Sequence, residues 1–237
     1  MIKSILSLVL ILTFSSTKKH EDEYKNFFNQ RKDYTSAKTK KLGVTTLNHN
    51  LLNRTVFQLV NEKRQKKGLD SLKYTSALNK VSLVFQNKLE LRRFTNTSSI
   101  ERKISKTLYS KTKKSGFDGG LVIPVVGEHE ALDYDGNSEF FYNKNDKKSE
   151  FKLFYGIKPR KSELNPKRTE IQALDYYSFA KKILKKLESE NKRELYSKAY
   201  KWGGLHLQWY YKSLNKRKIP QIKMILILGG YATSGMR

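Results

Sequence analysis

Val56–Asn96, VFQLVNEKRQKKGLDSLKYTSALNKVSLVFQNKLELRRFTN, is the stretch that predicts the fold of this chain. Its first half places Val56, Leu59, Val60 and the aliphatic part of Lys63 at the three- and four-residue spacing of one helical face. Gly68 follows, and glycine is the residue that most often ends a helix in a left-handed conformation. The pattern therefore predicts an amphipathic helix that ends just before Gly68.

The second half of the same stretch predicts another amphipathic helix. Ser76 is a suitable N-terminal cap for it, and the helix is expected to end near Phe94–Asn96. An apolar stripe runs along it at helical spacing, formed by Leu78, Val81, Phe85 and Leu89. The whole stretch is thus interpreted as two helices joined by a short link.

Beyond Asn96 the chain alternates between helical and extended patterns, which indicates an α+β fold rather than repeated βαβ units. Glycine pairs at 119–120, 203–204 and 229–230 are interpreted as turns at strand ends. The expected elements are a short helix at Ile100–Tyr109, an extended run at Leu121–Val126, hairpin-like segments within Asp133–Tyr155, a helix at Tyr176–Glu190, and a terminal hairpin of Leu205–Tyr211 with Ile222–Leu228.

The first residues have the pattern of a secretory signal. An apolar run, Ile5–Phe14, is too short for an ordinary membrane-spanning helix, and small residues and then charged residues follow it. We expect residues 1–17 to be a signal peptide, 18–50 to be a polar arm, and 51–232 to form the folded domain with an insertion near 137–167. The predicted location is secreted, periplasmic or extracellular, with no stable transmembrane span, and an uncleaved membrane anchor is the alternative.

The amino-acid composition of the chain indicates which classes of partner it favours. The chain has 48 Lys and Arg against 22 Asp and Glu, a net charge of +26, which favours an acidic polymer, an anionic surface or nucleic acid, the last being less favoured. Biased composition alone also produces a generally basic, solvated surface. The candidate polyanion-binding residues cluster at one hairpin tip and are Lys212, Lys216, Arg217 and Lys218. The chain contains no cysteine, which excludes disulfides, thiolate nucleophiles and cysteine-based metal sites.

Four segments, in order along the chain, resemble the bacterial, SCP-like extracellular branch of the CAP superfamily, which includes cysteine-rich secretory proteins, antigens and pathogenesis-related proteins. The first is the pattern Val-x3-Val-Asn-x2-Arg-x3-Gly-Leu-x2-Leu over Val56–Leu72. The others are Phe94-x-Asn96, Gly127-Glu128 where the family has Gly-Glu-Asn, and Asn191–Tyr196 followed by Tyr200 and Gly203-Gly204. The resemblance spans Leu51 to Tyr231 and implies a three-layer α-β-α sandwich.

The resemblance also implies a cleft, in which the family typically places two histidines and acidic residues that bind a divalent metal. Here Asn96 and Asn191 stand at the two histidine positions, while Glu128 is retained and Glu188 is a further candidate. An amide oxygen is a weak ligand for zinc-like metals, so we predict no metal and no cofactor. A calcium-like ion held by these four oxygen-bearing residues is the alternative.

The remaining residues offer little catalytic chemistry. The histidines are His20, His49, His129 and His206, and none has the helical spacing of a metalloprotease motif. His206 alternates with leucines and is expected to face solvent or the cleft. The sequence therefore favours a non-catalytic binding module with a basic surface over an enzyme. The alternatives are a hydrolase that uses Glu128 with Glu130 or Glu188, and an exported binder of polyanions or nucleic acid.

Overall fold

The computed structural model describes residues 36–40, 42, 47–88, 97–130, 140–143, 168–171, 174–214 and 217–231. The expected signal peptide, Asn96 and Lys216 lie outside these residues, as do most of the polar arm and of the insertion. Side chains are not described at 129–130, 140–143, 168–171, 209–214 and 217–221. Among the described residues, no helix combines the length and the apolar character needed to cross a membrane.

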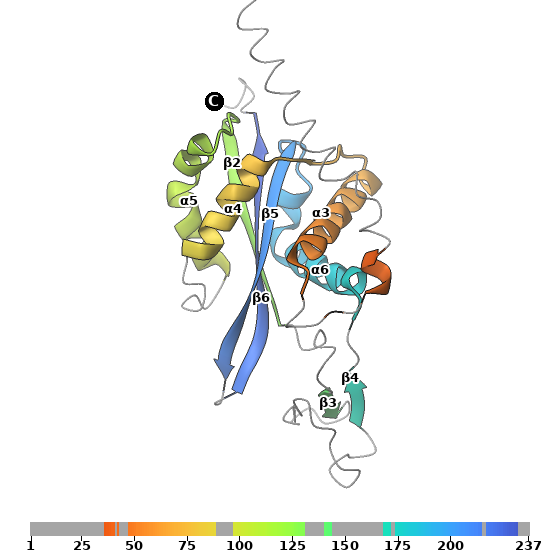
Figure 1. Cartoon of the computed structure of the whole chain (residues 1–237). Helices are drawn as coiled ribbons and strands as arrows, with labels where there is room; N and C mark the ends of the chain where they lie inside the picture. The colour runs from red at the N-terminus through yellow and green to blue at the C-terminus, as the bar shows by residue number, and fades with distance from the viewer. Residues whose placement is uncertain are drawn as a thin grey trace, which may run out of the picture.

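A four-stranded sheet lies between two pairs of helices (Figure 1). The strand order is β1 (Lys73–Tyr74), β5 (Trp202–Leu214), β6 (Arg217–Gly230) and β2 (Leu121–Glu130); β1 is parallel to β5 and the other neighbours are antiparallel. The helices α3 (His49–Lys66) and α6 (Tyr176–Leu195) cover one face, and α4 (Ser76–Lys88) and α5 (Thr97–Lys114) cover the other. The predicted α+β class and three-layer α-β-α sandwich are confirmed.

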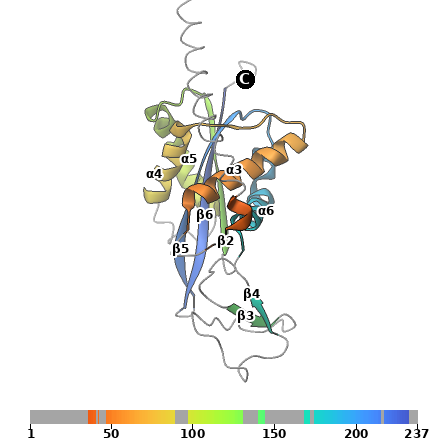
Figure 2. The same cartoon turned by 45° about the vertical axis from the view of Figure 1, so that its right-hand side comes forward.

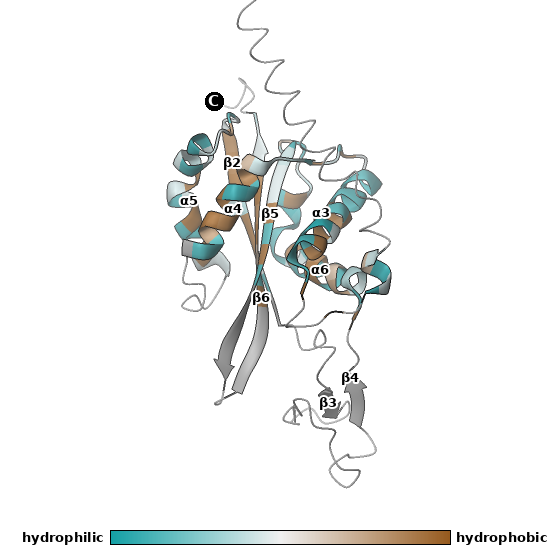
Figure 3. Ribbon diagram, viewed as in Figure 1, coloured by the Kyte–Doolittle hydropathy of each residue, from teal (hydrophilic) through white to brown (hydrophobic). Residues whose placement is uncertain are grey.

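Two hydrophobic cores result, one on each face of the sheet, and the apolar residues turn inward on both (Figure 3). The central strand β6 supplies both cores, because successive side chains of a strand point to opposite faces. Met224, Leu226 and Leu228 enter the core beneath α3 and α6, while Ile225 and Ile227 enter the core beneath α4 and α5. The predicted interior strand at Ile222–Leu228 is therefore confirmed.

The first helix is longer than its apolar stripe indicated, beginning at His49 rather than near Val56. Asn48 caps it by accepting a hydrogen bond from the Leu51 N–H at 2.9 Å. Gly68 ends it as predicted, with φ +68°, and the Leu69 N–H donates to the Arg64 carbonyl at 3.0 Å. That bond closes a Schellman turn.

The next helices differ from the prediction at their ends. The α4 helix begins at Ser76, but the preceding Thr75 takes the capping role, since its hydroxyl accepts from the Ala77 N–H at 3.3 Å. The described part of α4 ends at Lys88, so the predicted continuation through Leu89 lies outside the described residues. The α5 helix covers Thr97–Lys114 rather than the ten residues expected, and α6 continues to Leu195 through a kink.

Two of the three glycine pairs do not form turns, contrary to the prediction. Gly203-Gly204 and Gly229-Gly230 lie inside β5 and β6. A Cβ atom on Gly204 would lie 2.1 Å from the Asn79 nitrogen of α4, and one on Gly230 would lie 2.1 Å from the Ala199 carbonyl oxygen. These glycines therefore permit close approach of backbones, a role that strand patterning cannot distinguish from a turn.

The strands also pair differently from the expected hairpins. Phe140–Asn143 forms β3, whose partner is β4 (Arg168–Ile171) rather than a nearby segment of Asp133–Tyr155. This small sheet lies beyond the end of the sandwich in both views (Figures 1 and 2). The terminal hairpin is confirmed and is longer than predicted, with β5 and β6 paired from Trp202↔Gly229 to Leu214↔Arg217.

Candidate functional site

Asn191 forms a hydrogen bond with β2, the strand at one edge of the sheet. Its side-chain nitrogen donates to the Val126 carbonyl at 3.0 Å, and Asn191 is 7% exposed. Its backbone leaves the helical region (φ −135°, ψ 32°), which produces the kink in α6. Val126, whose carbonyl Asn191 binds, also donates its own N–H to the Glu101 carboxylate of α5 at 3.1 Å. Both backbone polar groups of Val126, in the edge strand β2, thus have hydrogen-bond partners: α6 binds its carbonyl from one layer and α5 binds its N–H from the other.

Glu101 was not identified from the sequence. Burial raises the pKa of its carboxyl, while the hydrogen bond from Val126 lowers it, and Glu190 and Glu194 raise it further. These three carboxylates come from α5 and the end of α6. No spacing in the sequence relates them, so only the packed structure reveals them as neighbours of the β2 edge.

Glu128 belongs to a polar row that crosses three strands. Gln208, Lys223 and Glu128 are cross-strand partners, and the Lys223 ammonium lies 3.8 Å from the Glu128 carboxylate. Lys223 is 1% exposed, so this ion pair is shielded from solvent on the lysine side. A buried ammonium without its carboxylate would be strongly unfavourable. Glu128 therefore has a structural role irrespective of any chemistry.

Gln86 of α4 covers this row. Its Nε2 atom donates to the His206 carbonyl at 3.1 Å and to the Lys223 carbonyl at 3.0 Å. The two donor bonds determine the orientation of the amide, because a flipped amide would place its oxygen against both carbonyls. The Oε1 atoms of Gln86 and Gln208 are buried without a hydrogen-bond partner among the described groups. The region around Glu128 thus combines a buried cation with acceptors.

Glu188 contacts the opposite layer. Its carboxylate accepts from the Tyr196 hydroxyl at 2.5 Å and lies 3.3 Å from the Lys63 ammonium of α3. Burial, reinforced by this carboxylate, raises the pKa of Tyr196. These partners tie α3 to the end of α6. They give Glu188 a structural role at the α3–α6 contact.

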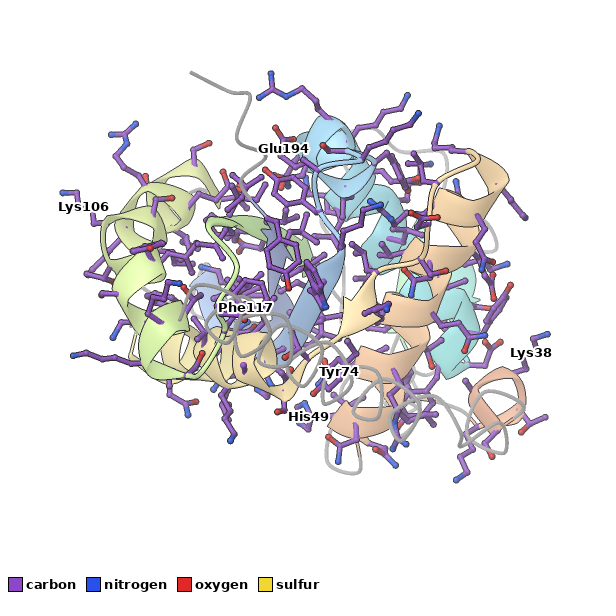
Figure 4. The ribbon with its side chains drawn as sticks, turned by 90° about the horizontal axis from the view of Figure 1, so that it is seen from above. Lys38, His49, Tyr74, Lys106, Phe117 and Glu194 are labelled. Atoms are coloured by element: carbon purple, nitrogen blue, oxygen red, sulfur yellow. The ribbon has the colours of Figure 1, made fainter. Side chains whose placement is uncertain are left out.

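His206 is half-buried and near a second histidine. Burial lowers its pKa, and the charge of His49 lowers it further. Burial also lowers the pKa of His49, while a hydrogen bond with the Leu207 backbone raises it. His49 begins α3 and lies toward α4 when the molecule is seen from above (Figure 4). The helix start and β5 thus bring together two histidines that are 157 positions apart in the sequence.

This pair predicts an acid-sensitive stability. A histidine whose pKa is lowered on folding contributes stability that is complete above its unfolded value of 6.5 and is lost as pH falls toward the folded value. Between pH 7 and about pH 5, we expect His206→Gln to lose less free energy of unfolding than the parent, measured by urea unfolding. His49→Gln should act in the same direction, and parallel losses in parent and variants would contradict the prediction.

Arg64, within the motif that opens the fold, is a buried structural anchor. We expected Lys63 to complete the buried face of the helix, but its side chain is 49% exposed while Arg64 is 1% exposed. The Arg64 guanidinium donates to the carbonyls of Leu195 at 2.6 Å and Tyr200 at 3.1 Å. Asn61 donates to the Leu72 carbonyl at 3.0 Å and accepts from the Leu72 N–H at 2.8 Å. The motif residues thus hold loops in place.

Three of the predicted polyanion-binding residues, Lys212, Arg217 and Lys218, lie at one end of the β5–β6 ribbon, while Lys216 is outside the described residues. The last pair of β2 with β6 is Glu130↔Gln221, and beyond it β5 and β6 continue alone to Leu214↔Arg217. This two-stranded end contains the pairs Lys212↔Ile219 and Ser213↔Lys218. It extends past the helices in both views (Figures 1 and 2). The basic residues are therefore carried away from both hydrophobic cores.

Among the described side chains, no group of three or more His, Asp and Glu residues is placed to hold a metal ion. Asn191, Glu188 and His206 have the separate partners given above, while Asn96 lies outside the described residues. Glu128 and Asn191 share the β2 edge, where Asn191 bonds Val126 two residues before Glu128.

Comparisons with known proteins give a distant structural likeness. The chain is similar to a cysteine-rich secretory protein from Staphylococcus aureus subsp. aureus Mu50, with a TM-score of 0.36 and 14% sequence identity. The likeness covers 76% of this chain and 40% of that chain, so it spans well under half of the Staphylococcus protein. No protein-family model matches the sequence, and no curated protein matches it.

Proposed function

We propose that the protein is an exported, divergent CAP-like module that binds acidic polymers without catalysing a reaction. The observation that carries the proposal is the basic end of the β5–β6 ribbon, which continues past the last pairing with β2. Lys212, Arg217 and Lys218 fall within this end, and Lys216 precedes Arg217 in the sequence, in a chain of net charge +26. A polyanion gains affinity there by releasing its condensed counterions.

The contacts of the cleft candidates support a non-catalytic role. A general base or acid must be able to exchange protons with a substrate. Glu128 is held beside the buried Lys223, and Asn191 donates to a backbone carbonyl. Glu188, one of the two candidates for the second carboxylate of the hydrolase alternative, binds Tyr196 and Lys63, and the side chain of the other, Glu130, is not described. Export rests on the N-terminal apolar run, and secretion of a reporter fused to residues 1–17 would test it.

A salt titration tests the ribbon. The protein purified without residues 1–17 is titrated with single-stranded DNA and, separately, with dextran sulfate at several salt concentrations. For DNA, the plot of log K against log salt should flatten by about 3 when all four basic residues are changed to Gln, since each lost contact removes about 0.7 from the slope. Affinity for dextran sulfate should also fall, because the proposed interaction does not depend on bases.

The matched control changes four exposed lysines on the helices to Gln, namely Lys66, Lys106, Lys181 and Lys192. It removes the same charge from the surface away from the ribbon, so it should leave most of the slope intact. Equal effects of the two sets would show that overall charge, not the ribbon, governs binding. Absence of salt-dependent binding in the parent would reject the proposal.

A further inference from the structure

An open groove of about 240 Å³ lies between α4 and α5, and Val81, a residue of the core beneath these helices, contributes to its lining. Its lining combines apolar and cationic side chains: Lys80, Val81, Val84, Lys111, Lys114 and Ser115. Val81 is 2% exposed and Val84 is partly exposed. The groove therefore has an apolar floor beneath a rim of three lysines.

The described residues of the rim are cationic. Among the lining residues that the structure describes there is no carboxylate. Within the described part of the chain, Lys80 and Lys114 make no ion pair, and the Lys111 ammonium lies 5.6 Å from the centre of the Phe85 ring. Phe85 is itself buried in the core beneath α4. The lysine charges thus surround an apolar surface and are available to an anion from outside.

We infer that this groove binds a small amphiphilic carboxylate, with one carboxylate on an apolar body of about eight non-hydrogen atoms. The size follows from the volume, since a water molecule occupies about 30 Å³ in the liquid and the groove therefore holds about eight such units. The apolar body covers Val81 and Val84, and the carboxylate lies among the ammonium groups. A neutral apolar molecule would crowd these charges without pairing them.

The composition of the groove selects this chemistry over other anions. A polyphosphate or a charged polymer would engage the lysines but leave the apolar floor uncovered. A carboxylate with an apolar body satisfies both parts, because apolar surface and charge are removed from water together. The site is separate from the basic ribbon, which consists of β5 and β6 residues, so the inference does not depend on the proposed polymer binding.

Octanoate is the probe, used with the full chain lacking only residues 1–17. We expect saturable binding with a Kd of about 1 mM or tighter, followed by NMR of the valine and leucine methyl groups. The methyl signals of Val81 and Val84 should move most. Octanol tests the apolar body without the charge, and acetate tests the charge without the body; both should bind at least about fivefold more weakly.

The affinity for octanoate should fall about tenfold in a triple variant that carries Lys80→Gln, Lys111→Gln and Lys114→Gln, because each exposed ion pair contributes up to about a fivefold effect. The affinity for octanol should not change. Val84→Thr keeps the side-chain shape and should lower the affinity for both octanoate and octanol, because it makes the apolar floor more polar. Lys106→Gln is the control for loss of a single lysine outside the groove, since Lys106 points outward from α5 (Figure 4). It should have no effect.

Three results would overturn the inference. The first is octanol binding as tightly as octanoate, which would remove the role of the lysines. The second is methyl shifts that spare Val81 and Val84, or no saturable binding at all. The third is an equal loss of affinity in Lys106→Gln and in the triple variant, which would indicate attraction by overall charge. Each variant is checked for an unchanged urea midpoint, so that loss of binding is not confused with unfolding.

Discussion

Arg64→Met is expected to destabilise the protein by at least about 3 kcal/mol, because it removes a buried cation that holds several backbone groups. The guanidinium of Arg64 donates to four backbone carbonyls, those of Asp70 at 2.9 Å, Leu195 at 2.6 Å, Ser197 at 3.2 Å and Tyr200 at 3.1 Å. Methionine fills similar space but has no donor. Carbonyls at the end of α6 and in the following loop would then be left without this partner.

Urea unfolding followed by circular dichroism measures this loss as a lower midpoint at unchanged slope. Lys63→Met is the matched control, because it removes one positive charge from the adjacent position of α3. Its ion pair with Glu188 spans 3.3 Å but Lys63 is 49% exposed, so we expect a change within about 1 kcal/mol. A loss below about 1 kcal/mol for Arg64→Met would show that water or a relaxed loop replaces the guanidinium.

Gly204→Ala is expected to cost about 3 kcal/mol or to prevent folding, because it forces two backbones apart. The added methyl would lie 2.1 Å from the Asn79 nitrogen and 2.4 Å from the Leu78 carbonyl carbon. Neither atom belongs to a flexible side chain, so α4 as a whole would have to move off β5. That movement would also disturb the hydrogen bonds of Ser82 to Ile225 and of Gln86 to β5 and β6.

Gly203→Ala is the control, since it changes the neighbouring residue of the same strand on the other face. Its methyl would lie 3.0 Å from the edge of the Phe57 ring, a side chain that can shift by a few tenths of an ångström. We expect it to cost clearly less than Gly204→Ala in thermal and urea unfolding. Equal losses would mean that loss of glycine in β5, rather than contact with α4, determines the effect.

The helices and the central strand could be predicted because their signals are local. Apolar residues recur at helical spacing from Val56 onward, and Gly68 ends the helix within its own turn. Ile222–Leu228 is buried on both faces, and its run of apolar residues, interrupted by Lys223, indicated an interior strand. The position of β4 could not be predicted, because Arg168–Ile171 pairs with a segment about thirty residues earlier and has no strong apolar alternation.

The candidate site was less predictable than the fold. Glu128 and Asn191 are both near the β2 edge, but their contacts involve Lys223 and Val126 rather than each other. Nothing in the sequence indicated that Lys223, inside an apolar run, would be buried as the partner of Glu128. Glu101 was also missed, because a charged residue in an amphipathic helix is expected to face solvent. The sequence gives no sign that its carboxylate accepts a hydrogen bond from the backbone of β2.

Residue order alone specifies the amphipathic helices, the end of the first helix and the interior strand, because each depends on neighbours within a few positions. Three-dimensional packing specifies the roles of the polar residues. Arg64 donates hydrogen bonds to carbonyls of residues 131 and 136 positions away in the sequence, and Asn191 donates one to a carbonyl 65 positions away. The free energy of a buried polar group depends on those partners, so its role as anchor or exposed charge is settled only when the layers pack together.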